Sequence, residues 1–474
     1  MSADPAVPTV DSVEGLRTQI VGIDKQVPLL DGSTQRYINL DNAASTPTFR
    51  RVEEKVNEFL GWYSSVHRGF GFKSLLSTRV YEHARKIVAG FVGADLQTNC
   101  VIFGKNATEA LNKVAHRFPL QPDDVVLCSL GEHHSNDLPW RQRARVHHIA
   151  MTNDGSLDED DLDRLLDRYA GRVKLVAISG GQNVTGWVAP VHRIAERVHA
   201  SKAKIIVDAA QLAPHRTIDM RPDDEPDHLD FVAFAAHKLY APYGIGVLVG
   251  PAWVFDAGTP DLVGGGTVDI VTAKDVQWAS PPGREEAGTP NVVGAVALAT
   301  SIRLLSEVGM EAIAAHEREL TGYTLGRLNR LGGIKIYGSS DPDRLEDRLG
   351  NIVFSVEGIP HGKVAAILGF EAGIGVRSGL FCAHPYLLWL LGIGEEQTRM
   401  HQQQILKNDW ANLPGLVRVS LGCYNTFYEI DHLIEMLQRI LHNDYYGDYA
   451  QDRATGCFWP RDYDWALVDK RFSL

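Results

Sequence analysis

Hydrophobic residues occur along much of the chain in short uninterrupted runs, each followed by polar residues. Runs of this length with polar ends are typical of buried strands in an α/β sheet. Between them, apolar residues recur at helical spacing, as in the segment 191–198. This alternation predicts a mostly parallel sheet with right-handed crossovers. The clearest predicted strands are Val125–Ser129, Val173–Ser179, Ile205–Val207 and Phe231–Ala235.

The pattern changes near residue 305, where helices rich in Glu and Arg and further strands begin. A chain of 474 residues is too long for one ordinary core, which favours two domains. We expect a large α/β domain over residues 45–304 and a smaller α+β domain over 305–442. Residues 1–44 form an N-terminal arm that belongs with the small domain. The aromatic-rich tail, 443–474, is expected to pack on the body or on a partner subunit.

Composition excludes several classes of function. The net charge of −12 argues against a nucleic-acid partner. The apolar run 386–394 is far shorter than the roughly 20 residues that span a bilayer, and the N-terminus lacks the features of a signal peptide. Five scattered cysteines without a CxxC motif fit a reducing compartment. We therefore expect a cytoplasmic protein without a membrane partner.

Candidate chemistry appears at two predicted strand ends. Asp208 closes one strand, and Lys238 follows the other closely. Ligands of such sheets bind at the carboxyl ends of the strands. The pair has two interpretations: a buried salt bridge, or a pyridoxal 5′-phosphate (PLP) site. In the second, the lysine forms a Schiff base with the cofactor, and the carboxylate keeps the pyridine nitrogen protonated.

Motifs in the rest of the chain favour the cofactor. Together they resemble the class V aminotransferase superfamily of PLP enzymes, particularly its cysteine desulfurase and selenocysteine lyase branch, from about residue 36 to 441. The resemblance implies a fold-type I PLP-dependent transferase, active as a homodimer. In chain order the motifs are DNAASTP (41–47), GKNATEALN (104–112), EHHSNDLPW (132–140), QNVTG (182–186), VDAAQ (207–211), AHK (236–238), EEAGTPN (285–291), VRSGLFCAHP (376–385) and VRVSLGCYNT (417–426).

A helix is expected to begin at Ala107 and Thr108, directly after a strand. Its free N–H groups and positive end suit an anion. Thr108 could instead be an ordinary N-cap, and Asp41 and Asn42 could either cap the next helix or lie near the site. The resemblance assigns Ala107 and Thr108 to the cofactor phosphate.

The resemblance also implies roles for other residues. Lys238 is the Schiff-base lysine, and Thr289 reaches the phosphate in the neighbouring subunit. The remaining cofactor contacts are His133 stacking on the ring, Asn183 beside the ring and substrate, Asp208 at the pyridinium nitrogen, Gln211 at the phenolic oxygen and His237 at the phosphate. The chain departs from the family at Ala235, where desulfurases generally have a phosphate-binding serine, and at Gly71 and Phe72, where a second histidine is usual. We expect no metal, because His133 and His134 lack a matching ligand set.

Two arginines are candidates for binding a substrate carboxylate, Arg377 and Arg418, since a planar guanidinium matches a carboxylate bidentately. Either could be a structural ion pair. Arg418 matches the arginine that binds the substrate carboxylate in the family.

Cys382 aligns with the nucleophilic cysteine of the desulfurases, whose thiolate takes sulfur from a cysteine substrate. Against this, apolar Leu380 and Phe381 precede it, and an amphipathic helical segment lengthens the chain before Arg418. The thiol could be only a small buried hydrophobe. We expect a PLP enzyme acting on an amino acid by desulfurase-like or related C–S lyase chemistry, with a sulfur acceptor as a further partner. The alternative is an aminotransferase or amino-acid epimerase that does not use Cys382.

Overall fold

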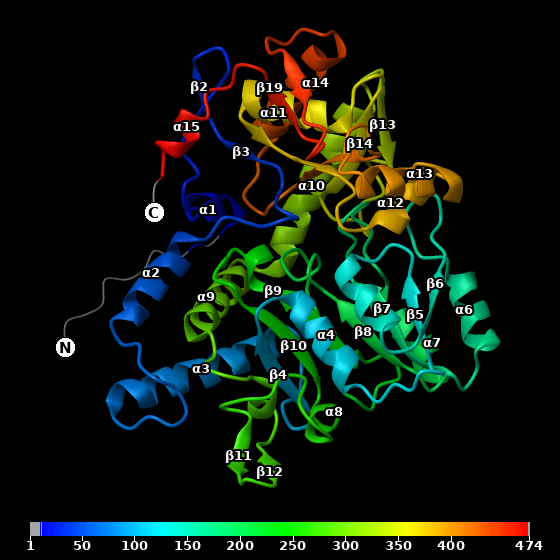
Figure 1. Cartoon of the computed structure of the whole chain (residues 1–474). Helices are drawn as coiled ribbons and strands as arrows, with labels where there is room; N and C mark the ends of the chain where they lie inside the picture. The colour runs from blue at the N-terminus through cyan, green and yellow to red at the C-terminus, as the bar shows by residue number, and fades with distance from the viewer. Residues whose placement is uncertain (1–9, 11, 473–474) are drawn as a thin grey trace.

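The computed structural model describes residue 10 and residues 12–472. Parts of the expected arm (1–9 and 11) and of the expected tail (473–474) lie outside these described residues. A seven-stranded sheet forms the centre of the larger part of the molecule, in the order β4-β10-β9-β8-β7-β5-β6 (Figure 1). Only β10 runs antiparallel to its neighbours, so the expected mostly parallel sheet is confirmed. Its strands are β4 (Asn99–Gly104), β5 (Val125–Ser129), β6 (Arg145–Ile149), β7 (Val173–Ser179), β8 (Lys204–Asp208), β9 (Phe231–Ala235) and β10 (Gly246–Pro251).

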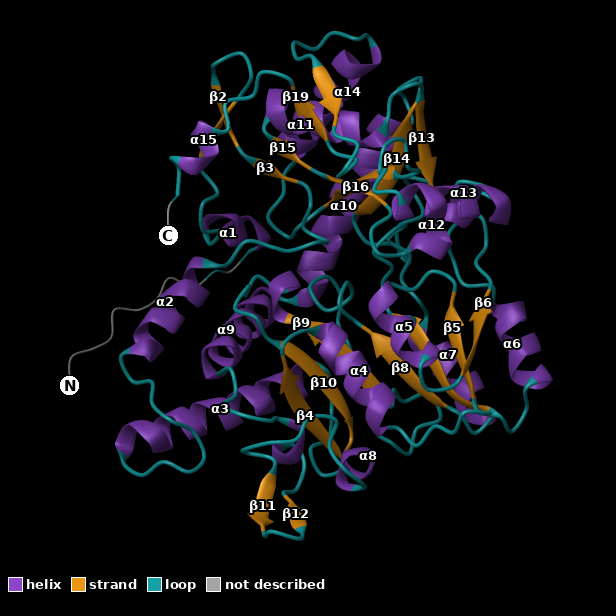
Figure 2. Cartoon of the chain, viewed as in Figure 1, coloured by secondary structure: helices purple, strands orange, loops and turns teal. Residues whose placement is uncertain are grey.

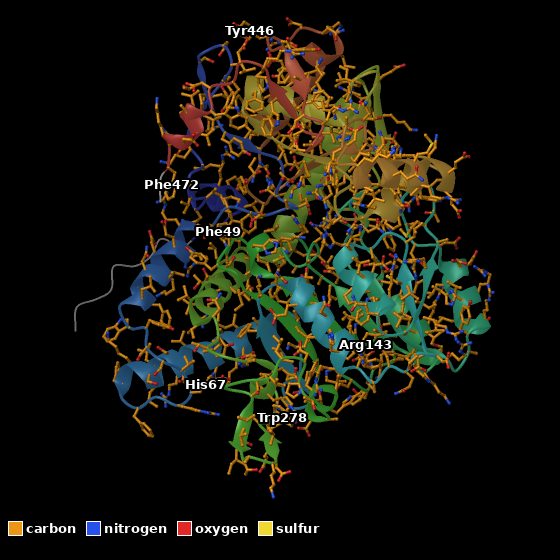
Figure 3. The ribbon with its side chains drawn as sticks, viewed as in Figure 1. Phe49, His67, Arg143, Trp278, Tyr446 and Phe472 are labelled. Atoms are coloured by element: carbon orange, nitrogen blue, oxygen red, sulfur yellow. The ribbon has the colours of Figure 1, made fainter. Side chains whose placement is uncertain are left out.

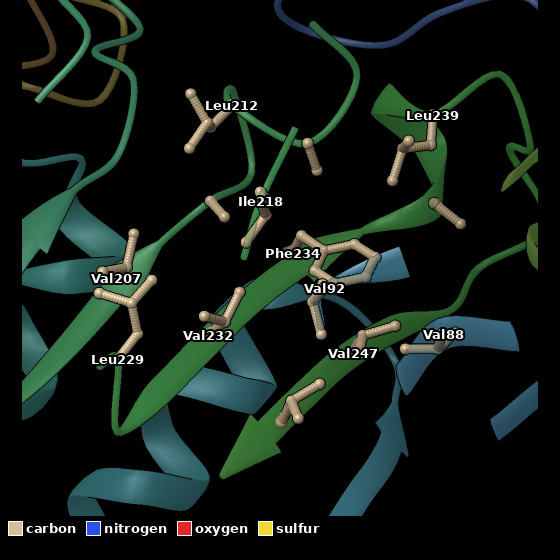
Figure 4. Close-up of a cluster of buried hydrophobic side chains, with 14 of the residues drawn as sticks. Val88, Val92, Val207, Leu212, Ile218, Leu229, Val232, Phe234, Leu239 and Val247 are labelled. Atoms are coloured by element: carbon tan, nitrogen blue, oxygen red, sulfur yellow. The ribbon is translucent and has the colours of Figure 1, made fainter. Parts of the chain in front are cut away.

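The sheet separates two hydrophobic cores, because alternate side chains of a strand point to opposite faces. Val232 and Phe234 of β9 face one core, and Phe231 and Ala233 face the other. Figure 4 shows the first core, where Val207 and Val247 from neighbouring strands join them. The helices around the sheet are α2 (Arg50–Leu60), α3 (Phe72–Phe91), α4 (Ala107–Arg117), α5 (Leu138–Arg141), α6 (Glu159–Arg168), α7 (Val191–Ala200), α8 (Ala252–Asp256) and α9 (Val292–Val308).

A second, antiparallel sheet in the order β13-β14-β17-β16 lies beyond the first and has a core of its own (Figure 2). The N-terminal part joins it, because β3 (Ile38–Asn39) pairs in parallel with β15 (Ile374–Gly375). The elements of this part are α1 (Val13–Thr18), β1 (Gln26–Pro28), β2 (Thr34–Arg36), α10 (Met310–Leu328), β13 (Ile334–Tyr337), β14 (Asn351–Val356), α11 (His361–Ala372), β16 (Arg377–Gly379), β17 (Leu416–Ser420) and α14 (Phe427–Leu441).

The aromatic tail packs on the body, as expected. A hairpin of β18 (Tyr449–Gln451) and β19 (Phe458–Pro460) is followed by α15 (Ala466–Asp469). The ring of Phe370 in α11 contacts those of Trp459 and Tyr463. Tyr446 and Phe472 of the tail remain exposed (Figure 3). A second hairpin, β11 (Val268–Val271) with β12 (Val276–Trp278), extends from the far end of the molecule (Figure 1).

Local details differ from the sequence predictions at helix ends. Helix α3 ends at Phe91, just before Gly93 with φ +67°. Asn106, rather than Thr108, caps α4, and its side chain accepts from the Glu109 N–H. Asp41 and Asn42 cap no helix, since α2 begins only at Arg50.

No single helix among the described residues is long and apolar enough to cross a membrane. Helices α9 and α10 meet the criteria of length and composition only as a pair, and they are bent by 76° at their junction.

Candidate cofactor and substrate site

A pocket of about 230 Å³ lies at the carboxyl ends of β7, β8 and β9. Three short 3₁₀ segments complete the loops of the large sheet: His134–Asn136, Ala236–Lys238 and Gly283–Glu285. All of the predicted site residues except Thr289 line this pocket: Ala107, Thr108, His133, Asn183, Asp208, Gln211, His237, Lys238, Arg377, Cys382 and Arg418. Residues from both sheets therefore meet in one cavity.

Asp208 and Lys238 are neighbours across the pocket floor, because β8 and β9 pair in parallel. Among the described residues no direct ion pair joins these two side chains. The interpretation of the pair as a simple salt bridge is therefore excluded. Burial lowers the pKa of Lys238 to about 8, although the Asp208 charge opposes this. Burial also raises the pKa of Asp208, against a hydrogen bond of 2.9 Å from the Ala210 N–H. A buried carboxylate without a cationic partner suits a protonated ring nitrogen.

His133 follows β5 and lines the pocket as a neutral ring. Burial, then the charge of Lys238, lowers its pKa to about 3. Its Nδ1 accepts a hydrogen bond of 3.1 Å from the Ser135 N–H, so Nε2 carries the hydrogen. An uncharged imidazole can stack on an aromatic ring without adding charge.

The sequence pattern assigned no role to Glu132, the residue before His133. It is buried, and its oxygens accept from the Ser129 hydroxyl, the Ser179 hydroxyl and the Asn136 amide at 2.5, 2.6 and 2.7 Å. Burial raises its pKa to about 7, against these hydrogen bonds. The carboxyl group thus ties the ends of β5 and β7 together beneath His133.

The N-terminus of α4 forms one end of the pocket, where its free N–H groups suit an anion. Ala107 and Thr108 provide its first turn, and the Thr108 hydroxyl lies 2.7 Å from that of Ser135. Burial lowers the pKa of His237 to about 4, so this ring is neutral. Ala235 brings no hydroxyl to this pocket, but Ser135 does. Sequence reasoning missed Ser135, whose only signal is that it is the single hydroxyl residue in the motif 132–140.

Gln211 is buried and carries an unused hydrogen-bonding atom. Its Nε2 donates to the Ala43 carbonyl at 2.8 Å, whereas its Oε1 has no partner. Buried polar atoms normally have partners, so an unpaired atom in a pocket wall indicates a ligand. With the anion-binding turn, the buried carboxylate and the lysine of lowered pKa, this atom fits PLP.

Arg418 and Arg377 are cross-strand neighbours on β17 and β16. Arg418 is buried and donates to the Asn183 carbonyl and to Asp41 Oδ1, both at 3.0 Å. Arg377 is about half exposed, with its Nε 3.7 Å from Asp41 Oδ2. Two guanidinium groups thus share one carboxylate, which leaves one positive charge for a substrate carboxylate. Asp41 was predicted either to cap the next helix or to lie near the site, and its contact with Arg418 places it near the site.

Cys382 lies in the loop after β16 and is exposed at the pocket. The alternative of a small buried hydrophobe at Cys382 is therefore wrong. Its backbone is left-handed, with φ +55°, as is that of Phe381 at +48°. Two hydrogen bonds of 2.7 Å hold this turn: the Asn183 amide donates to the Phe381 carbonyl, and the His134 N–H donates to the Cys382 carbonyl. A left-handed backbone at a non-glycine residue is strained, so these contacts are needed to hold the turn.

The apolar residues before Cys382 have structural partners. The Arg418 guanidinium lies over the Phe381 ring, 5.0 Å from its centroid, and Leu380 packs on the main core. The longer segment before Arg418 forms α12 (His384–Leu390) and α13 (Glu395–Leu406). Both helices lie beside the mouth of the pocket, and a groove of about 310 Å³ separates them. Thr289 is exposed outside the pocket of its own chain, and its role in a partner stays a prediction.

Comparisons with known proteins agree with this geometry. Residues 38–433 match the model of the family "Aminotransferase class-V". The chain is 33% identical over 438 residues to a probable cysteine desulfurase of Halalkalibacterium halodurans, covering 90% of this chain and 98% of the relative. It is 32% identical over 416 residues to a cysteine desulfurase of Haloferax volcanii, covering 86% and 90%.

Solved structures give the same result. The apo cysteine desulfurase of Thermococcus onnurineus superposes with a TM-score of 0.75 at 32% identity, over 86% of this chain and 95% of that one. The cysteine desulfurase CsdA of Escherichia coli gives 0.74 at 28% identity, over 91% and 99%.

The chain therefore belongs to the class V aminotransferase family, whose members are PLP-dependent enzymes of fold type I. The expected fold class is confirmed. Within the family its relatives are cysteine desulfurases, so the expected branch and the expected desulfurase-like kind of enzyme are confirmed as well.

Proposed function

We propose that this protein removes sulfur from L-cysteine, releases alanine and carries the sulfur as a persulfide on Cys382. The observation that supports this most strongly is the exposed Cys382 in the same pocket as Lys238 and Arg418. The Cys382 thiolate attacks the substrate sulfur and forms an S–S bond as the substrate C–S bond breaks. The electron pair of the broken bond stays on the substrate Cβ, which takes up a proton and completes alanine.

PLP supplies an electrophilic aldehyde and a ring that accepts an electron pair. Lys238 would hold the aldehyde, Asp208 the ring nitrogen, and Thr108 and Ser135 the phosphate. His133 would lie against the ring. A lysine with a pKa near 8 moves a proton readily at neutral pH, so Lys238 is the group that takes and returns the substrate Cα proton.

Arg418, with Arg377, binds the substrate carboxylate beside Asp41. The net single positive charge of this trio matches an amino acid with one free carboxylate. Because Arg418 also rests on Phe381, next to the nucleophile, carboxylate binding and positioning of Cys382 are linked. The exposed persulfide is open to a sulfur acceptor. A homodimer with Thr289 in the neighbouring site and a cytoplasmic location remain predictions.

A single turnover of the holoenzyme with L-cysteine tests the proposal. Wild-type protein is expected to give one alanine and one persulfide per site, and Cys382→Ala neither. Cys457→Ala is the matched control, because Cys457 is the other exposed thiol among the described residues and lies in the tail. Pyruvate and sulfide from both wild type and Cys382→Ala would indicate elimination without the cysteine. Keto acid or racemised amino acid instead would indicate the aminotransferase or epimerase alternative.

A further inference from the structure

Two histidines and an aspartate meet at the edge of the large sheet opposite the pocket. His199 lies at the end of α7, and His228 and Asp230 lie directly before β9. Nε2 of His199 is 2.8 Å from Asp230 Oδ2, and Nε2 of His228 is 3.3 Å from Asp230 Oδ1. The two imidazole rings stack with centroids 4.2 Å apart and planes at 21°.

Backbone carbonyls determine where both rings carry hydrogen. Nδ1 of His199 lies 2.7 Å from the Pro226 carbonyl oxygen, and Nδ1 of His228 lies 2.6 Å from that of Glu225. A carbonyl oxygen only accepts, so each Nδ1 is the protonated nitrogen. In a neutral ring Nε2 then presents a lone pair, and both lone pairs face the Asp230 carboxylate. Either a proton on Nε2 or a cation between the three groups satisfies this arrangement.

The carboxylate is held in place by its other contacts. Asp230 Oδ2 accepts from the Ile205 N–H at 2.9 Å, and Oδ1 lies 2.7 Å from Lys204 Nζ. The Asp230 side chain is 3% exposed, whereas that of Lys204 is 37% exposed and can turn toward water. Protons on both Nε2 atoms would place two like charges on stacked rings. A single divalent cation would leave both rings neutral.

We propose that His199, His228 and Asp230 bind a divalent transition-metal ion, with Zn²⁺ as the best match. Zinc takes histidine and carboxylate ligands at about 2.0–2.2 Å in a tetrahedron, which sets neighbouring ligand atoms about 3.3 Å apart. The separations are to different oxygens, 2.8 Å to Oδ2 for His199 and 3.3 Å to Oδ1 for His228, and one ligand atom from each of the three residues lies within 4.8 Å of the others. A backbone carbonyl on the far nitrogen of each histidine is the usual outer contact of such ligands. Water completes the fourth position.

The site joins α7 to the loop before β9, so its role is to stabilise the fold rather than to take part in the reaction. Side-chain exposures of 13% for His199 and 12% for His228 give an ion access from solvent. The ligands come from two points of the chain, His199 and the pair His228 and Asp230, without a known ligand motif, which is why the sequence pattern gave no indication of them.

Zinc titration by calorimetry tests the site in untagged holoenzyme carrying Cys382→Ser and Cys457→Ser, because an exposed thiol is itself a zinc ligand. We expect one ion per chain, and at least about tenfold weaker binding in His199→Gln and in His228→Gln. His192→Gln is the matched control. His192 lies on the same helix as His199, and its Nδ1 also contacts a loop carbonyl, that of Asp227, at 2.9 Å. Lys204→Gln is expected to bind zinc more tightly, because it removes a competing cation.

Equal zinc affinity in the two histidine variants and the parent would overturn the proposal, as would no binding by the parent. If the variants do not fold, crystals of the unmodified holoenzyme soaked in zinc chloride decide the matter. An anomalous peak within bonding distance of the three ligands is expected, and peaks only elsewhere would refute the site. Neither readout uses catalytic activity, so the result is independent of the proposed desulfurase reaction.

Discussion

The floor of the pocket and its mouth are built in opposite ways. Asp208 ends β8 and Lys238 follows β9, so regular strands of the central sheet position the floor. Cys382 lies in an exposed left-handed turn, held by hydrogen bonds from Asn183 and His134. A rigid floor fixes the cofactor chemistry that a whole family shares, whereas a loop mouth can change the reaction and the acceptor.

The largest expected effect is on the floor. Lys238→Ala should lower the rate of alanine formation by at least about a thousandfold, because it removes both the cofactor bond and the proton carrier. The rate is measured with L-cysteine, and cofactor loading by absorbance. Lys335→Ala, an exposed lysine on β13, is the control. Activity within tenfold of wild type would mean that the floor lysine is not the catalytic group.

The second-largest effect is expected at Arg418 and Arg377, the two arginines proposed to bind the substrate carboxylate. Arg418→Lys keeps the charge but loses the fork that reaches Asp41 and the Asn183 carbonyl. We expect kcat/KM for L-cysteine to fall by about a hundredfold, mostly through KM. Arg377→Lys should cost less, because Arg377 is half exposed. A larger effect at Arg377 than at Arg418 would reverse the assignment.

The lowered pKa of Lys238 also predicts how the rate of cofactor loading depends on pH. Only a neutral amine reacts with an aldehyde. Because its pKa is lowered to about 8, Lys238 becomes neutral at a lower pH than an ordinary lysine does. The rate of covalent PLP loading by apoenzyme should therefore rise about tenfold per pH unit below the Lys238 pKa of about 8 and level off above it. Stopped-flow absorbance between pH 7 and 9.5 measures it. A rate that rises without a plateau up to pH 9.5 would contradict the lowered pKa.

The smallest effect concerns the phosphate end. Ser135→Ala removes the hydroxyl that lies 2.7 Å from that of Thr108 and should weaken PLP binding by about three- to tenfold. Equilibrium dialysis of the cofactor measures this. The double variant Ser135→Ala with Ala235→Ser places a hydroxyl at the position usual in the family and should restore binding. Unchanged affinity in Ser135→Ala would exclude the hydroxyl from the site.

The same contrast explains what the sequence could predict. Strand β9 is Phe231–Ala235 as expected, because an apolar run with polar ends is a local signal. The 11 predicted residues that line the pocket lie together because strand ends and helix N-termini have fixed places in this fold. Asp41 beside Arg418, and Ser135 beside Thr108, could not be predicted, since these contacts join distant segments.

The mouth was the least predictable part. The apolar neighbours of Cys382 left a buried thiol open as an alternative, but Phe381 packs under Arg418 and the cysteine is exposed. Side-chain direction in a turn depends on backbone φ values and on partners from other strands, which hydrophobicity alone does not encode.

Mass spectrometry of the Cys382 peptide after one turnover with L-cysteine tests the central claim most directly. The account predicts that this peptide becomes heavier by one sulfur atom, in step with alanine formation, while the Cys457 peptide is unchanged. Alanine formed at the wild-type rate with no sulfur on Cys382, or by Cys382→Ala, would contradict it.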